Sequence, residues 1–118
     1  MQYLKVRLRS VRFALQGLQA LWATQPNVRI HVVATLCVVA AGGYCQISRT
    51  DWLALVLAIA LVWVAEALNT GIEWVVDLAS PAQHPLAGKA KDVAAAGVLL
   101  ASLAAIAVGW LVFTPYII

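Results

Sequence analysis

The chain has 118 residues, of which 64% are hydrophobic and 11% are charged, and its mean hydropathy is +0.89. This composition is typical of an integral membrane protein, and three spans of roughly 20 residues each leave no room for a separate soluble catalytic domain. The net charge is +3, but the basic residues flank apolar stretches, so we attribute them to membrane topology and not to nucleic-acid binding.

The first element that we expect is an amphipathic surface helix over residues 1–25. Apolar side chains recur at steps of three and four along residues 4–22, and lysine, arginine and glutamine occupy the adjacent face. Such a helix should lie in the membrane interface with its cations near anionic headgroups, and packing on a partner protein is the alternative. Thr24-Gln25-Pro26-Asn27 then predicts a break, because proline fits a turn or the first turn of a helix.

Three membrane spans and one cytoplasmic loop should follow. We expect the spans at 28–47, 52–77 and 89–116, and the loop, which contains proline, glycine and serine, at 78–88. Basic residues precede the first and third spans, whereas only Arg49 lies between the first and the second. By the positive-inside rule, the N-terminus and the 78–88 loop are therefore cytoplasmic. The expected fold is an all-α multi-pass protein of the cell (inner) membrane, with a surface helix and three transmembrane helices.

The second span carries a polar stripe near its cytoplasmic end. Its members recur at helical spacing and so share one face: Glu66, Asn69 or Thr70, Glu73 and Asp77. Ionisable groups inside a membrane are costly, and by default they mark a functional site. If Trp52 marks the outer interface, Glu66 lies about 21 Å into a hydrocarbon layer of about 30 Å, within reach of a lipid headgroup.

The stripe and the start of the third helix, with Lys91 and Asp92, together allow phosphoryl chemistry. Mg²⁺ binds one or two carboxylates together with waters and phosphate oxygens, and a lysine neutralises charge on a transferring phosphoryl group. A carboxylate set deep in the membrane can act as a general base, and the depth estimate selects Glu66. On spacing alone, an interhelical polar clasp and a proton or cation pathway stay open as alternatives.

These segments resemble the prokaryotic diacylglycerol kinase family, which includes the undecaprenol kinases of Gram-positive bacteria. The likeness lies in Glu66-Ala-Leu-Asn-Thr-Gly-Ile-Glu-Trp-Val-Val-Asp77, in Lys89-Ala-Lys-Asp92 and in Pro26-Asn-Val-Arg-Ile-His31. The resemblance implies a single integral membrane kinase domain over residues 1–118. It also implies a homotrimeric bundle, active sites shared between neighbouring subunits, and transfer of the γ-phosphate of ATP-Mg to a lipid alcohol.

The resemblance further assigns roles to single residues. It implies that Glu66 is the catalytic base and that Glu73 is a ligand of Mg²⁺. Residues implied to position ATP and its phosphates are Asn69, Asp77, Gly88, Lys91 and Asp92. His84, in the 78–88 loop, could also approach the nucleotide, and a solvated loop histidine is the alternative. Gln25 stands where the family usually has a glutamate that serves as a second metal ligand, so its amide oxygen would bind Mg²⁺ without contributing charge.

The expected function is therefore phosphorylation of a membrane lipid alcohol by ATP at the cytoplasmic side. Diacylglycerol is the first expected acceptor and undecaprenol the alternative, because both lipids present a hydroxyl at the interface. A small transporter or a non-catalytic assembly protein is the alternative of a different class. A transport stripe should continue to the outer face, whereas residues 52–65 and 93–118 carry no charge, and this favours the kinase.

Overall fold

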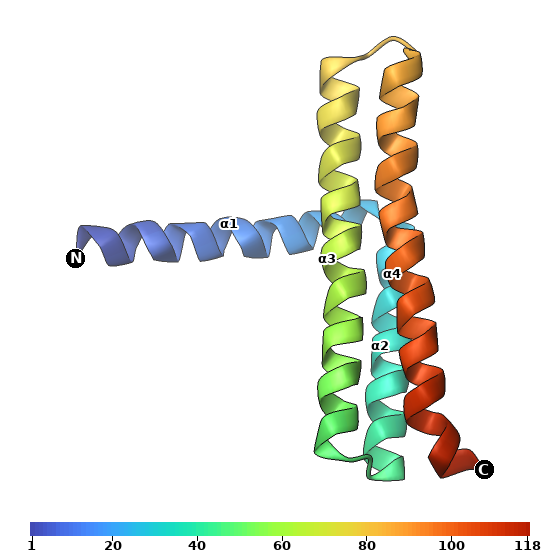
Figure 1. The fold of residues 1–118 in the computed structure, drawn as a ribbon. Helices are drawn as coiled ribbons and strands as arrows, with labels where there is room; N and C mark the ends of the chain where they lie inside the picture. Colours follow the sequence, from blue (N-terminus) through green and yellow to red (C-terminus); the bar gives the residue numbers. More distant parts are fainter. The chain divides into compact units, whose positions relative to one another are not determined.

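The structure, a computed structural model, describes residues 1–118 and consists of four helices without any strand. They are α1 (Gln2–Thr24), α2 (Pro26–Cys45), α3 (Arg49–Ala79) and α4 (Pro85–Ile117), as Figure 1 shows. Helices α2, α3 and α4 are each long and apolar enough to cross a membrane, which confirms the expected all-α fold with three spans. Two compact units divide the chain, residues 1–33 and residues 34–118.

In the first unit, α1 leaves large apolar side chains such as Leu8 and Leu15 exposed. An exposed apolar face is what a helix in the membrane interface requires. The helix ends at Thr24, Gln25 is extended, and α2 begins at Pro26, so the break predicted at 24–27 is confirmed. Across this break, the Arg29 guanidinium lies 5.5 Å from the centre of a Trp22 ring, at the distance of a cation–π contact.

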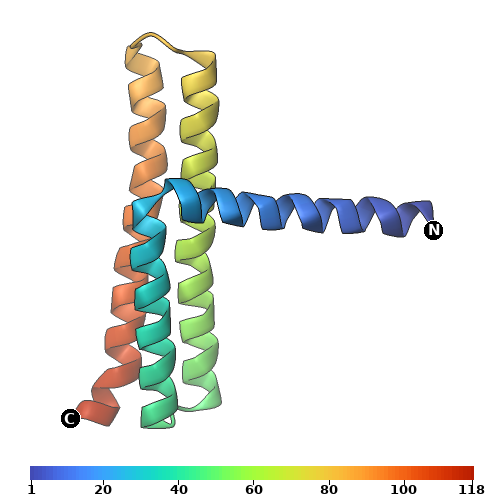
Figure 2. The same cartoon turned by 180° about the vertical axis from the view of Figure 1, so that it is seen from behind.

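In the second unit, α3 and α4 form an antiparallel hairpin. They lie side by side in both Figure 1 and Figure 2 and are joined by the turn at 80–84. Helix α3 has 31 residues and α4 has 33, which gives lengths of about 46 and 50 Å at about 1.5 Å per residue. Because both lengths exceed a hydrocarbon layer of about 30 Å, part of the hairpin must project beyond the membrane core.

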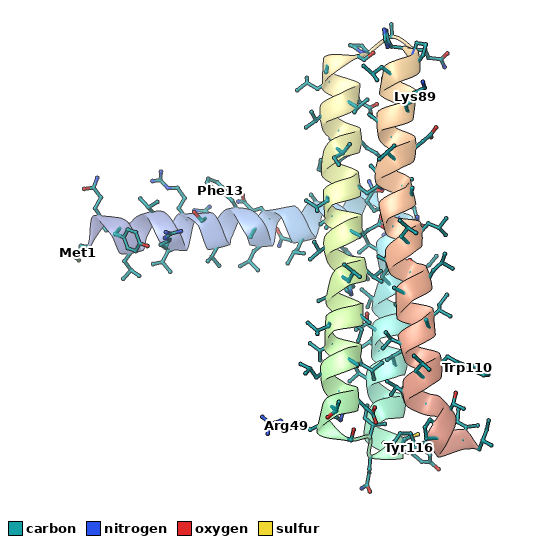
Figure 3. All side chains as sticks on the ribbon, viewed as in Figure 1. Met1, Phe13, Arg49, Lys89, Trp110 and Tyr116 are labelled. Carbon is teal, nitrogen blue, oxygen red and sulfur yellow. The ribbon has the colours of Figure 1, made fainter.

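The end of the hairpin far from this turn is held together by a small core and a polar clasp. The core is a buried apolar cluster of Ile47, Leu55 and Val112. In the clasp, the Tyr116 hydroxyl donates to Asp51 Oδ2 at 2.9 Å and accepts from the Ser48 backbone N at 3.3 Å. Figure 3 shows Arg49 and Tyr116 at this end and Lys89 at the other.

The connections are shorter than the sequence predicts, because side chains cap the helices early. The loop expected at 78–88 is reduced to 80–84, since His84 Nδ1 accepts a hydrogen bond from the Leu86 backbone N at 3.1 Å and Pro85 fits the first helical turn. The outer connection is confined to 46–48, since Ser48 Oγ accepts from the Asp51 backbone N at 3.1 Å and so starts α3 at Arg49. Both spans of the hairpin therefore begin earlier than the expected residues 52 and 89.

Candidate functional site

The site begins with a stretch of α3 in which polar side chains are buried and apolar ones are exposed. Glu66 is 3% exposed and Asn69 9%, and Thr70 is 1% exposed. On the same helix Leu61 and Leu68 are at least half exposed. This distribution reverses that of a soluble protein. It is what a membrane helix needs when its apolar sides face lipid or another subunit while its polar groups face the protein interior.

One hydrogen bond links two members of the stripe, and two buried atoms beside it have no partner. Asn69 Nδ2 donates to Glu73 Oε1 at 3.3 Å across one helical turn. The other amide atom, Asn69 Oδ1, and the hydroxyl oxygen of Thr70 are buried without a hydrogen-bond partner. Buried polar atoms are almost always paired in native proteins, so unpaired ones call for an explanation such as a missing ion or ligand.

A second part of the site is a surface hollow of about 620 Å³ at the turn between α3 and α4. Four of the residues predicted to position ATP line it: Asp77, His84, Gly88 and Lys91. Lys91 Nζ forms an ion pair with Asp77 Oδ1 and so ties the start of α4 to the end of α3. His84 is exposed and caps α4 from the rim of the hollow, and its approach to a nucleotide stays a prediction.

The two parts lie along one helix. Glu66 and Asp77 are separated by about three turns, which is about 16 Å along the axis of α3, and Asn69 and Glu73 lie between them. Along α3, the predicted site residues therefore follow one another from Glu66 to the hollow at the turn. Asp92 is exposed and follows Lys91 on α4, but it does not line the hollow.

The residues present fit a Mg²⁺ that is bound together with a nucleotide. No group of three or more histidine, cysteine, aspartate or glutamate side chains is gathered closely enough to hold a metal ion. Mg²⁺ needs only one or two carboxylates when phosphate oxygens and waters complete its shell. Glu73 would supply the carboxylate, and the unpaired Asn69 Oδ1 beside it would accept a hydrogen bond from a water of that shell.

Gln25 lies in the unit of residues 1–33, at the junction of α1 and α2. Its side chain is half-buried, and its Nε2 donates to Thr24 Oγ1 at 3.4 Å. This hydrogen bond uses the amide nitrogen and leaves the amide oxygen, which is the atom that could bind a cation. The role of Gln25 as a metal ligand stays a prediction.

Sequence reasoning missed two features near Glu66. Thr70 had no assigned role, although its spacing of four residues from Glu66 placed it on the polar face. Trp63 Nε1 donates to the hydroxyl of Thr35 at 3.1 Å, which fastens α3 to α2 within the second unit. This link joins residues 28 positions apart, so no local pattern predicts it.

Comparison with known proteins gives consistent matches. A family model described as prokaryotic diacylglycerol kinase matches residues 12–113. A diacylglycerol kinase of Synechocystis sp. is 40% identical over 107 residues, which cover 90% of this chain but only 61% of that relative. An undecaprenol kinase of Bacillus subtilis is 36% identical over 92 residues, which cover 78% of this chain and 75% of that relative. A diacylglycerol kinase of Escherichia coli is 31% identical over 99 residues, which cover 84% of this chain and 81% of that relative.

Proposed function

This chain belongs to the prokaryotic diacylglycerol kinase family, and from that premise we propose that it phosphorylates a membrane lipid alcohol with ATP. The observation that carries the proposal is the buried polar stripe of α3, which runs from Glu66 towards the hollow lined by Lys91. A purely structural clasp would pair its polar atoms, whereas Asn69 Oδ1 and the Thr70 hydroxyl are unpaired. This difference favours a site that is completed by substrate.

In the proposed reaction, Glu66 is the general base. Its carboxylate accepts the proton of the lipid hydroxyl as that oxygen forms a bond to the γ-phosphorus of ATP. The bond between the γ-phosphorus and the oxygen bridging to the β-phosphate breaks, and ADP leaves. When bound, Mg²⁺ neutralises charge on the phosphates, and the residues that would hold it are Glu73 and Gln25.

The hollow is the proposed place for the nucleotide, and the α3 stripe is the path for its phosphates. Lys91 would neutralise phosphate charge while Asp77 holds its ammonium group in place. His84 and Gly88 line the same hollow, and Asp92 follows Lys91 on α4. Asn69 would keep Glu73 oriented towards the metal through its hydrogen bond.

The proposed arrangement in the cell is a homotrimer in the inner membrane with the hollow on the cytoplasmic side. Lys89 and Lys91 lie at the hollow end of the hairpin, and the positive-inside rule favours the cytoplasm for that end. ATP is available on that side. Large apolar side chains such as Leu57 and Leu103 are exposed on the spans, so the single chain offers ample surface for lipid and for other subunits.

The acceptor that we propose first is diacylglycerol, with undecaprenol as the alternative, because relatives named for each of these activities resemble the chain. The test is phosphoryl transfer from γ-labelled ATP by the purified full chain in mixed micelles. Each lipid alcohol is offered separately, and the Glu66→Gln protein serves as the control. We expect a labelled lipid phosphate with at least one acceptor. Absence of product with every lipid alcohol would overturn the proposed function.

A further inference from the structure

Thr70 has a buried hydroxyl that does not form a hydrogen bond with a backbone carbonyl of its own helix. A threonine in a helix can donate to the carbonyl one turn earlier. Thr24 does so with Ala20 O at 2.7 Å, and Thr114 does so with Trp110 O. Thr70 is only 1% exposed, yet its hydroxyl has no partner. Since a buried unpaired hydroxyl destabilises a fold, this arrangement has a cost and requires a compensating role.

The position of Thr70 indicates what that role is. The residue lies one turn after Glu66 and one turn before Glu73, and side chains at this spacing share a helix face. Its hydroxyl is thus held between the proposed base and the proposed metal ligand. In the proposed reaction the transferred phosphoryl group lies between the same two residues, because Glu66 deprotonates the attacking lipid oxygen and Glu73 binds the cation on the phosphates.

We propose that the Thr70 hydroxyl is a catalytic hydrogen-bond donor to the γ-phosphoryl group during its transfer, an inference that rests on the proposed function. The lipid oxygen forms its bond to phosphorus, the bond to the bridging oxygen breaks, and the lipid proton passes to Glu66. Thr70 keeps its own proton and donates only a hydrogen bond to a non-bridging phosphoryl oxygen. A donor fixed in a water-excluded site stabilises such charge more than an exposed one does.

The burial of Thr70 agrees with this role. The hydroxyl is closed to water in the chain without substrate, so bound substrate must displace neighbouring side chains to reach it. Once substrate is bound, the donor is fixed on a helix, so little further reorganisation is needed as charge develops on the phosphoryl oxygens. Closure against water also suppresses transfer of the phosphoryl group to water.

The test compares Thr70→Val, which keeps the shape but lacks the hydroxyl, with Thr70→Ser, which keeps the hydroxyl. The measurements are kcat and KM for ATP and for the lipid alcohol that wild type phosphorylates, and the thermal unfolding midpoint of the nucleotide-free protein. For Thr70→Val we expect kcat to fall on the order of 10²-fold while the KM values stay unchanged. Its unfolding midpoint should be equal or higher, because an unpaired buried hydroxyl is gone. Thr70→Ser should retain most of kcat.

Thr114→Val is the matched control, since it removes a threonine hydroxyl from a membrane helix at the far end of the hairpin, and its turnover should equal that of wild type. Three results would overturn the inference: full activity of Thr70→Val, an equal loss in Thr70→Ser, or a loss of kcat accompanied by a lower unfolding midpoint. An inactive wild type would instead defeat the proposed function, before any variant is compared.

Discussion

Replacing Glu66 by glutamine should lower phosphoryl transfer by about 10²–10⁴-fold, the range for a lost general base. This loss corresponds to about 3–6 kcal/mol of activation free energy, at about 1.4 kcal/mol for each factor of ten. The structure separates this effect from misfolding. Glu66 is 3% exposed, and glutamine has nearly the same volume, so the change creates neither a cavity nor an overpacked core.

The assay is the initial rate of lipid phosphate formation at saturating ATP, together with the thermal unfolding midpoint. Asp51→Asn is the matched control, because it exchanges a carboxylate for an amide in the clasp with Tyr116, at the opposite end of the hairpin. Turnover of this control should stay close to that of wild type. A well-folded Glu66→Gln protein with near-normal turnover would remove Glu66 from the role of base.

Four further predictions concern Lys91, the sharing of active sites between subunits, Thr35 and Gln25. The ion pair of Lys91 with Asp77 is exposed and so is worth less than about 1 kcal/mol, which means that Lys91→Met should still fold. This variant should lose most of its phosphoryl transfer, because the charge that neutralises the phosphates is gone. If active sites are shared, mixing this variant with Glu66→Gln subunits should restore part of the turnover, whereas no recovery would indicate sites within one subunit. Thr35→Val removes the hydroxyl that accepts from Trp63 Nε1 and should lower the unfolding free energy by about 1 kcal/mol. Gln25→Glu should lower the Mg²⁺ concentration that the reaction requires.

The number and type of the elements could be predicted from the sequence, because long apolar runs have few alternatives in a membrane. Exact boundaries could not, since they depend on caps such as those of Ser48 and His84, whose side chains bond to backbone atoms two or three residues on. Each cap added helical residues that the sequence had placed in a connection. The predicted helices are too short for a physical reason: a helix extends to its capping residue, regardless of where the apolar run begins.

For the candidate site, the sequence predicts which side chains share a helix face, and their roles stay predictions. A spacing of three and four residues must place Glu66, Asn69 and Glu73 on one face of a helix. The structure adds the burial of Glu66 and Asn69 and the hydrogen bond between Asn69 and Glu73. What spacing cannot reveal is which polar atoms are left unpaired. It offered Asn69 or Thr70 as alternatives for one place in the stripe, whereas both side chains are buried there.

The charge at position 25 offers the sharpest test of how the metal is held. If Gln25 replaces a second carboxylate, Mg²⁺ relies on Glu73, phosphate oxygens and water. A new negative charge close to the cation should strengthen its binding by about 1–3 kcal/mol, or about 5- to 150-fold in the half-saturating Mg²⁺ concentration.

Gln25→Glu should therefore shift the rate curve against Mg²⁺ to lower concentration, when measured at saturating ATP. Glu73→Gln should shift the curve strongly to higher concentration, because no other carboxylate would remain to compensate. If both side chains face one cation, the Mg²⁺ requirement of wild type should thus lie between those of the two variants. An unchanged Mg²⁺ dependence in Gln25→Glu, beside a large shift in Glu73→Gln, would mean that the junction of α1 and α2 lies away from the metal. The cation would then be held by α3 and the nucleotide alone.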